Sequence, residues 1–513
     1  LTSRSRPNRR AVAQRASVDI ALVGLAVLAW FQLRQYSSPL IREANIDPFL
    51  AAAPVLGILA GGVIALRLLP PATGLAERLV SRKQWLATVL GMWQAGRRPH
   101  AGPVLLLALA VGVSTFAWSL VATWQKSLVD QAGHQVGAHL RIAEARPATP
   151  LDRRAQVVAL PGVQTVLPAW RTQGRVGAED VRGRSVSATV VALNAVAARD
   201  VVQLSEELAD SPPTVVFDRL AEARTGPLGS DLPAGASRIA GTIRTEDVRE
   251  LAVLTTSTTL LLSTPDGQIY RVPLPTVATD GVPVRFVVDL PDTGGSPLRL
   301  VGFEVDGLSL VANEYRFELT DLRTIRADGG EEPFDFGGEA WSFVRNGRAD
   351  AAQTPAPNSL RVVYRADEPR TTYILVPRHQ PVPVPAVVTP DVLRELGLEL
   401  GDEVPILLGG AMTARIVGTV KAVPSTEGSA VLMDLPTAAA NLLYQTGRTR
   451  PVTEWWIATD SEKHSEAVTA ARGLPQVEVF DLYSLTEQVS NDPYWIMARA
   501  GLLAAAIGAA LLA

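Results

Sequence analysis

Histidines are the side chains in this sequence most able to do chemistry at neutral pH, and there are five of them: His100, His134, His139, His379 and His464. Side chains share a helix face when they lie three or four positions apart. His134 and His139 are five apart, so they do not form a clean pair of metal ligands. We therefore interpret the histidines as solvated surface residues.

Two further features could bind a ligand or a partner. Glu331, Glu332 and Asp335 form an acidic cluster in a Gly-rich stretch, but their spacing matches no calcium-binding loop, so a solvated loop is the better interpretation. Trp455 and Trp456 are adjacent in an expected strand and must point to opposite faces. One indole is expected in the core, and the other is free to contact a ligand or a partner.

Known catalytic and cofactor motifs are missing from the sequence. It contains no P-loop, no G-x-G-x-x-G fingerprint, no H-E-x-x-H and no G-x-S-x-G. There are no cysteines, which excludes disulfides, thiol nucleophiles and thiolate metal sites. We therefore predict no catalytic, cofactor-binding or metal-binding residues and no enzymatic activity.

Composition indicates apolar segments joined to a folded polar part. The chain has 513 residues, enough for several domains, and is 47% hydrophobic but only 19% charged. The charged share is below the roughly 25% of an average soluble protein. The sequence begins on Leu1 without a signal-peptide pattern and stops within the apolar run YWIMARAGLLAAAIGAALLA, so we expect a fragment of a longer protein.

Four mostly apolar segments predict transmembrane helices, because a span requires about 20 mostly apolar residues. They lie at 18–34, 48–69, 101–125 and 494–513, the last one truncated. The first is the shortest, and an interfacial or buried helix is its alternative. Arg499, near the start of the last span, is expected to snorkel to the interface rather than to line an ion pathway.

The charge distribution predicts which loops are cytoplasmic. Residues 1–17 carry five arginines and no acid, which indicates a cytoplasmic tail. Residues 70–100 are also basic and contain RKQWLATVLGMWQAGRR, a pattern typical of an amphipathic interfacial helix, with a simple extension of the third span as the alternative. The chain is then expected to be a multi-pass plasma-membrane protein in which residues 126–492 lie on the extracytoplasmic side.

The long region between the last two predicted spans must fold by itself. Residues 126–236 and 359–492 mix helix and strand signals, whereas 237–358 contain short strands separated by turns, as in a jelly-roll-like β-sandwich. Within these regions the Pro-Asp-Gly turn at 265–267 predicts a hairpin, and a helix is expected to begin with Thr389 as its cap and to end at Gly397. The fold class predicted is thus a membrane protein with α-helical transmembrane spans and a large extracytoplasmic α+β domain interrupted by a β-sandwich. Such a domain stands on two helices, which is a mechanical arrangement.

Two stretches resemble the FtsX-like (MacB-like) family of ABC transporter permeases. WLATVLGMWQAGRRPHAGPVLLLALAVGVSTFAWSLVATWQKSL resembles the start of such a permease module. LRELGLELGDEVPILLGGAMTARIVGTVKAV resembles an extracytoplasmic pattern of the family, through Leu396-Gly397-Leu398, Gly401-Asp402 and Ile416-Val417-Gly418. These motifs are structural, and their order along the chain is the stronger argument.

The resemblance implies a porter-type permease subunit, here the second module of a member with about ten spans. It implies a separate cytoplasmic ATPase that binds ATP, a lipid bilayer, and a first permease module or a second permease copy as partners. An extracytoplasmic protein or ligand stays open, and no nucleic acid is expected. The implied function is mechanotransmission for export or extraction of a lipid, peptide or similar substrate. Control of a cell-wall hydrolase, or signalling, is the alternative.

Overall fold

Our computed structural model describes residues 101–513, with gaps at 147–149, 178–183, 223, 225–228, 250–253, 309–312, 337–339, 346–347, 352, 367–369, 379–381 and within 492–513. The predicted spans at 18–34 and 48–69 and the predicted interfacial helix in 70–100 lie outside the described residues. The chain divides into two compact units. One is Val129–Thr486, which we call the body. The other comprises Leu1–Leu128 and Glu487–Ala513.

The predicted fold class, a helical membrane protein, is wrong. Strands hold 43% of the described residues and helices 26%. Among the described residues, no helix is long and apolar enough to cross a membrane. The predicted multi-pass location in the plasma membrane, with residues 126–492 outside it, is contradicted by the same finding.

Helix α4 (Ala101–Val136) shows why the sequence pattern misled. The prediction rested on the uncharged stretch 101–125, but one helix continues through Lys126 to Val136. Its described residues also include several hydroxyl side chains. One of them, Thr115, donates to the carbonyl oxygen of Val111 at 2.7 Å, which satisfies a polar group locally without changing the helix.

The first part of the body is a nine-stranded mixed sheet with the order β19-β20-β18-β21-β3-β2-β22-β1-β23. Strand β19 also pairs with the end of β2, so six of these strands close into a ring. Both flanking halves of the sequence contribute to this sheet. Its strands are β1 (Leu140–Glu144), β2 (Val163–Val176), β3 (Val186–Leu193), β18 (Val384–Val388), β19 (Glu403–Leu407), β20 (Ala411–Thr419), β21 (Ala430–Asp434), β22 (Glu454–Thr459) and β23 (Val477–Asp481).

Helices cover the middle of the sheet on both faces, so every residue of β18, β21 and β22 is buried. Strands β19 and β20 instead alternate between buried and more exposed residues. The helices of this part are α5 (Arg153–Val158), α6 (Ala195–Ala198), the short 3-10 helix η1 (Glu206–Leu208), α7 (Pro213–Ala221), α8 (Pro390–Leu396), α9 (Leu435–Thr446) and α10 (His464–Arg472). Helix α11 (Leu482–Ser490) follows β23 and buries none of its residues.

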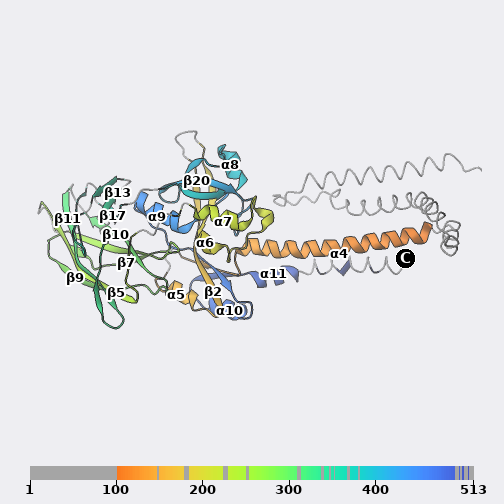
Figure 1. Cartoon of the computed structure of the whole chain (residues 1–513), viewed down its shortest axis with the longest axis horizontal. Coiled ribbons are helices and arrows are strands. Elements are labelled where there is room, and N and C mark those ends of the chain that lie inside the picture. The colour runs from red at the N-terminus through yellow and green to blue at the C-terminus, as the bar shows by residue number, and fades with distance from the viewer. Residues whose placement is uncertain are drawn as a thin grey trace, which may run out of the picture. The chain divides into compact units, whose positions relative to one another are not determined.

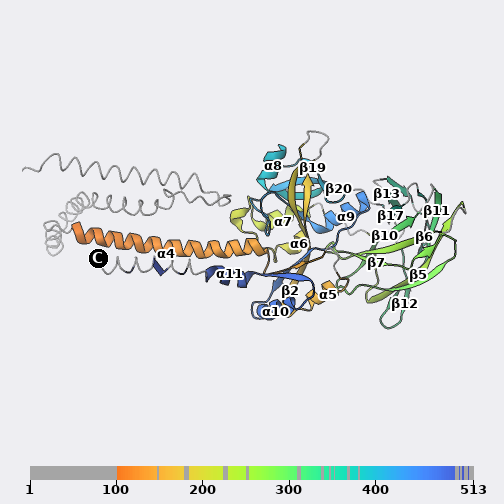
Figure 2. The same cartoon turned by 180° about the vertical axis from the view of Figure 1, so that it is seen from behind.

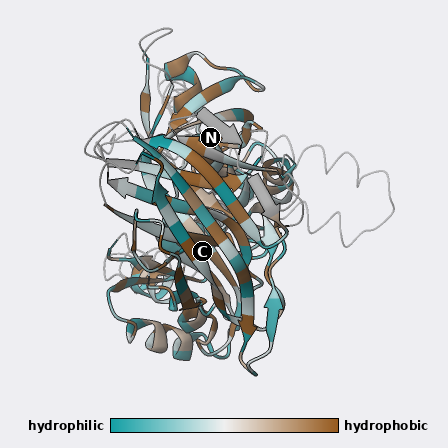
Figure 3. Cartoon of the chain, turned by 90° about the vertical axis from the view of Figure 1, so that its left-hand side faces the viewer, coloured by the Kyte–Doolittle hydropathy of each residue, from teal (hydrophilic) through white to brown (hydrophobic). Residues whose placement is uncertain are grey.

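A β-sandwich forms the second part of the body. One sheet has the order β14-β13-β17-β10-β6-β7, with β4 beside β10 and β8 beside β6; the other has the order β15-β16-β11-β5-β9, with β12 beside β11. Figures 1 and 2 place the sandwich at the end of the body opposite the start of α11. Seen from that end, its strands alternate between hydrophilic and hydrophobic residues (Figure 3).

The sandwich strands extend beyond the residues expected from sequence. They are β4 (Ser230–Asp231), β5 (Ala236–Asp247), β6 (Thr255–Ser263), β7 (Ile269–Pro273), β8 (Val277–Ala278), β9 (Val284–Asp289), β10 (Arg299–Leu308), β11 (Asn313–Arg326), β12 (Glu331–Pro333), β13 (Trp341–Arg345), β14 (Arg348–Ala351), β15 (Gln353–Ala356), β16 (Ser359–Ala366) and β17 (Arg370–Pro377). Strands β16 and β17 follow residue 358 but pair with sandwich strands.

Local sequence signals explain several of these elements. Pro390 occupies the first turn of α8, and Gly397 ends it in the left-handed region at φ 66°. The expected cap at Thr389 is not formed by its side chain; the Thr389 hydroxyl instead accepts from the N–H of Ala430. The Pro265–Gly267 turn joins β6 and β7 as the predicted hairpin.

Candidate functional site

The chain enters and leaves the body through two neighbouring antiparallel strands. Strand β1 follows α4, strand β23 precedes α11, and the two pair with Leu140 opposite Asp481. The N–H of Leu482 donates to the carbonyl oxygen of His139 at 3.1 Å. The start of α11 is therefore bonded to the segment that follows α4, and we call this place the junction.

A histidine and a carboxylate hold the junction together. The Nε2 of His464 lies 2.6 Å from Asp481 Oδ1, and the hydroxyl of Thr459 lies 2.6 Å from His464 Nδ1. The Asp481 carboxylate also accepts from the N–H groups of Tyr483 and Ser484, which caps α11. Burial opposes ionisation of Asp481, but the bonds from His464 and Ser484 outweigh it and lower its pKa.

This hydroxyl–imidazole–carboxylate order is that of a hydrolase triad, but its setting is structural. A triad needs a nucleophile that a substrate can reach. The side chain of Thr459 is 3% exposed and belongs to a strand covered on both faces. The carboxylate is engaged in capping α11 at the same time. We therefore assign the group to fixing the direction of α11.

The end of α4 is clamped by a loop from the second half of the chain. His134 donates from Nε2 to the carbonyl oxygen of Thr426 at 3.3 Å, and its own carbonyl accepts from Ser425. Burial lowers the pKa of His134, although the bond to Thr426 opposes this effect. Gly137 ends the helix at φ 86°, where a Cβ atom would come within 2.7 Å of the Trp456 ring. The last turn of α4 is thus fixed to the body.

A buried carboxylate joins four strands beneath the junction. Glu454 on β22 accepts from Arg141 Nη1 at 2.8 Å, from Trp456 Nε1 at 2.9 Å and from Arg171 Nη1 at 3.4 Å. The Arg141 guanidinium also lies 3.9 Å from the centre of the Phe480 ring on β23. Each buried charge has a partner, so the network fixes the register of β2, β22, β1 and β23.

Polar contacts fasten the sandwich to the rest of the body. Arg154 on α5 forms an ion pair with Asp266, in the β6–β7 turn, at 2.5 Å, with both side chains about nine-tenths buried. The same guanidinium donates to the carbonyl oxygen of Thr293. Gly267 brings the turn so close to α9 that a Cβ atom would lie 2.6 Å from the nitrogen of Pro436.

Helix α9 is shared by the two parts of the body. Leu442 packs into the core of the nine-stranded sheet. The next two residues, Leu443 and Tyr444, pack instead with Val301 and Ile374 of the sandwich. Because a helix buried on two sides cannot tilt freely against either, α9 makes the sandwich and the sheet one packed structure.

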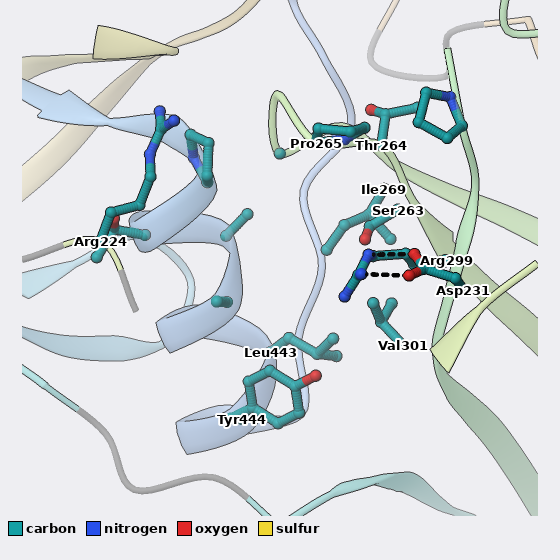
Figure 4. Close-up of a pocket in the computed structure, with 16 residues that line it drawn as sticks. Arg224, Asp231, Ser263, Thr264, Pro265, Ile269, Arg299, Val301, Leu443 and Tyr444 are labelled. Atoms are coloured by element: carbon teal, nitrogen blue, oxygen red, sulfur yellow. Dashed lines mark hydrogen bonds and ion pairs between the residues drawn. The ribbon is translucent and has the colours of Figure 1, made fainter. Parts of the chain in front are cut away.

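A cleft of about 430 Å³ lies between α9 and the sandwich. Its floor and walls are mostly apolar, with arginines on opposite sides (Figure 4). Arg224 is held by Asp434 and Asn194, and Arg299 is held by Asp231. The volume is within the range of small-molecule sites.

The residues singled out by sequence fall in different places. His464 is 6% exposed rather than solvated, because its partner Asp481 is distant in sequence. Both indoles of Trp455 and Trp456 are fully buried, in separate core clusters, so neither is available to a ligand or partner.

The acidic cluster forms surface ion pairs. Glu331 lies 2.9 Å from Arg323, and Glu332 lies 3.8 Å from Arg326. In the described part of the chain, no group of three or more histidines, aspartates or glutamates is arranged to hold a metal ion. His100, His379 and Arg499 lie outside the described residues. The junction and the cleft were both missed, since each is built from segments far apart in sequence.

No family model matches the sequence, and no curated protein matches it.

Proposed function

We propose that this chain is a permease-type subunit of an ATP-driven transporter. In this proposal a separate ATPase supplies the movement. The nine-stranded sheet transmits this movement to the sandwich, for export or extraction of a lipid, peptide or similar substrate. The resemblance to FtsX-like permeases suggested this role, and the junction is the observation that best supports it.

The junction supports the proposal because it couples two helices, α4 and α11, through one pair of hydrogen-bonded strands. Movement of α4 reaches β1, and movement of α11 reaches β23. These strands are paired over five residues, from Leu140 opposite Asp481 to Glu144 opposite Val477. A displacement of either helix is therefore passed to the same edge of the nine-stranded sheet.

The packing of the body supports the second half of the proposal. A relay must be stiff between its input and its output. The buried network around Glu454 stiffens the edge next to the junction. The pair Arg154–Asp266 and helix α9 then connect the sheet to the sandwich at the opposite end (Figure 1). Both connections are buried, so dissolved salt weakens the ion pair between Arg154 and Asp266 little.

Affinity purification tests this function directly. The full chain, carrying a tag, is isolated from its native cells, and the proteins bound to it are identified by mass spectrometry. We expect an ATPase with a P-loop in near-equal amount, retained by the surface variant Glu466→Ala. Purification without any ATPase would overturn the proposal. An ATPase accompanied by a cell-wall hydrolase would favour the regulatory version of the same mechanism.

A further inference from the structure

The cleft between α9 and the sandwich combines an apolar surface with two arginines, Arg224 and Arg299. Ile269 and Val301 of the sandwich pack with Leu443 of α9 and line the cleft with apolar side chains (Figure 4). Pro265, Pro297 and Pro436 also line it. Proline has a fixed φ angle, so a lining that contains three of them loses less conformational freedom when a ligand binds.

The two arginines of the cleft differ in how firmly they are held. The partner of Arg224 is Asp434, whose side chain is fully buried. Asp434 also caps α9 through the N–H of Thr437, and Arg224 donates to Asn194 as well. Displacing Asp434 would leave a buried charge without a partner, which is costly. Arg224, although its side chain is 28% exposed, is therefore not free to exchange its carboxylate partner for a ligand.

Arg299 is held by a partner that a ligand can replace. Its Nε and Nη2 atoms bind the two oxygens of Asp231, each at 2.6 Å. The Arg299 side chain is 19% exposed, whereas that of Asp231 is 65% exposed. Because this carboxylate is well hydrated, its ion pair with Arg299 contributes little free energy, and little is lost when the pair separates. The remaining nitrogen, Nη1, makes only a long bond of 3.4 Å to the carbonyl oxygen of Gly229.

The orientation of this guanidinium favours a ligand that comes from the cleft. In Figure 4 it lies on the α9 side of the Asp231 carboxylate, next to the apolar surface of Val301 and Leu443. Guanidinium groups bind carboxylates through two parallel hydrogen bonds. A carboxylate at this position would exchange one bidentate partner for another, while the rest of the ligand covers apolar side chains.

We propose that the cleft binds an anionic amphiphile, with its carboxylate on Arg299 and its apolar chain along Ile269, Val301 and Leu443. The affinity has two sources: burial of the chain against the apolar walls, and the charge-assisted bonds to Arg299. Asp231 competes with the ligand for the same two nitrogens. This binding site does not depend on an ATPase partner and so goes beyond the transport function proposed above.

Calorimetric titration of the full chain with octanoate and with octanol tests the proposal. The two probes share one apolar chain and differ in the charged head group. We expect octanoate to bind about tenfold more tightly than octanol, the equivalent of about 1.4 kcal/mol. Equal affinities, or no binding of octanoate, would overturn the proposal.

Three variants locate the site, and two of them act in opposite directions. Asp231→Asn removes the competing carboxylate and should strengthen octanoate binding severalfold without changing octanol binding. Arg299→Gln should reduce the affinity for octanoate to that for octanol. Ala440→Trp should fill the cleft and abolish binding of both probes.

The matched control is Arg271→Gln, which removes an arginine from the same sandwich sheet. Arg271 forms a bidentate pair with Glu304 but does not line the cleft. This variant should leave both affinities unchanged. The gain expected from Asp231→Asn cannot result from misfolding, so its absence in a folded variant would contradict the role of Arg299.

Discussion

The N–H of Leu482 is bonded to the carbonyl oxygen of His139, so the first residue of α11 is joined to the segment that follows α4. This single contact closes the antiparallel pair of β1 and β23 at the point where the chain enters and leaves the body. It makes two helices, more than three hundred residues apart in sequence, act on one edge of one sheet. The predictions below test this junction and the connections behind it.

Removing the junction carboxylate should loosen α11 and lower the stability of the body. Asp481→Ala deletes the cap of α11 and the partner of His464, and we expect a loss of about 2 kcal/mol in the free energy of unfolding. Chemical denaturation of the full chain measures it. The exposed carboxylate of Glu466 on α10 provides the control, since Glu466→Ala should change stability by less than about 0.5 kcal/mol. Equal effects of the two variants would show that Asp481 has no special role.

A disulfide between β1 and β23 should be tolerated if the two strands already move together. Ala143 and Glu478 are opposite each other in the pair, and the chain has no other cysteine to interfere. Paired residues in antiparallel strands lie at Cα distances that suit a disulfide. Ala143→Cys with Glu478→Cys should raise the melting temperature under oxidising conditions and leave co-purification of the ATPase intact. Loss of that partner on oxidation alone would mean that the strands must separate.

The buried pair between α5 and the sandwich should show strong coupling. Arg154→Met or Asp266→Asn alone leaves a buried charge without its partner, and each should cost about 3 kcal/mol. The double variant should cost clearly less than the sum of the two. A double-mutant cycle from urea denaturation measures this difference, and additive effects would contradict the assigned role of the pair.

Two glycines with nearly the same φ angle allow the cost of backbone strain to be measured separately from the cost of a steric clash. Gly267 has φ 89° and faces Pro436, whereas Gly295 has φ 88° and open space around its missing Cβ. Gly295→Ala should cost only the left-handed backbone term, about 1 kcal/mol. Gly267→Ala carries the same term and must also push α9 away. It should be the more destabilising change in thermal unfolding, and equal losses would argue against close packing there.

The clamp on α4 should make stability depend on pH. His134 has a pKa below the ordinary value of 6.5, because burial disfavours its charged form. Between the folded and unfolded pKa values the unfolded state binds more protons, so stability is fully present above pH 6.5. It falls as the pH drops from there through the folded pKa. His134→Gln should flatten this dependence in urea denaturation between pH 7.5 and 5, and an unchanged slope would contradict it.

Sequence reasoning succeeded where the cause of a structure is local. The turn at Pro265–Gly267 and the glycine that ends α8 depend on a few adjacent residues, and both were predicted. It failed where a partner is distant. His464 is buried because Asp481 comes to it from another strand, and Trp455 and Trp456 are both buried because helices cover both faces of β22.

The same limit explains the boundary of the sandwich and the missed cleft. A β-rich run does not state which sheet it joins, so β16 and β17 could not be assigned to the sandwich from their residues alone. The cleft depends on α9 and β10 meeting in space, and neither carries a binding motif. The uncharged run 101–125 predicted a span, but it is part of the longer helix α4, and no helix of the described residues is long and apolar enough to cross a membrane.

If the nine-stranded sheet transmits movement to the sandwich, these two parts of the body must behave as one stiff structure. Spin labels on Val287→Cys, in the sandwich, and Leu400→Cys, beside the nine-stranded sheet, test it most directly, since both side chains are exposed and the chain has no native cysteine. Pulsed electron resonance on the full chain with its co-purified partner should give one narrow distance distribution, identical with and without ATP. A broad distribution, or one that shifts on adding ATP, would show that the sandwich is hinged and would contradict the account.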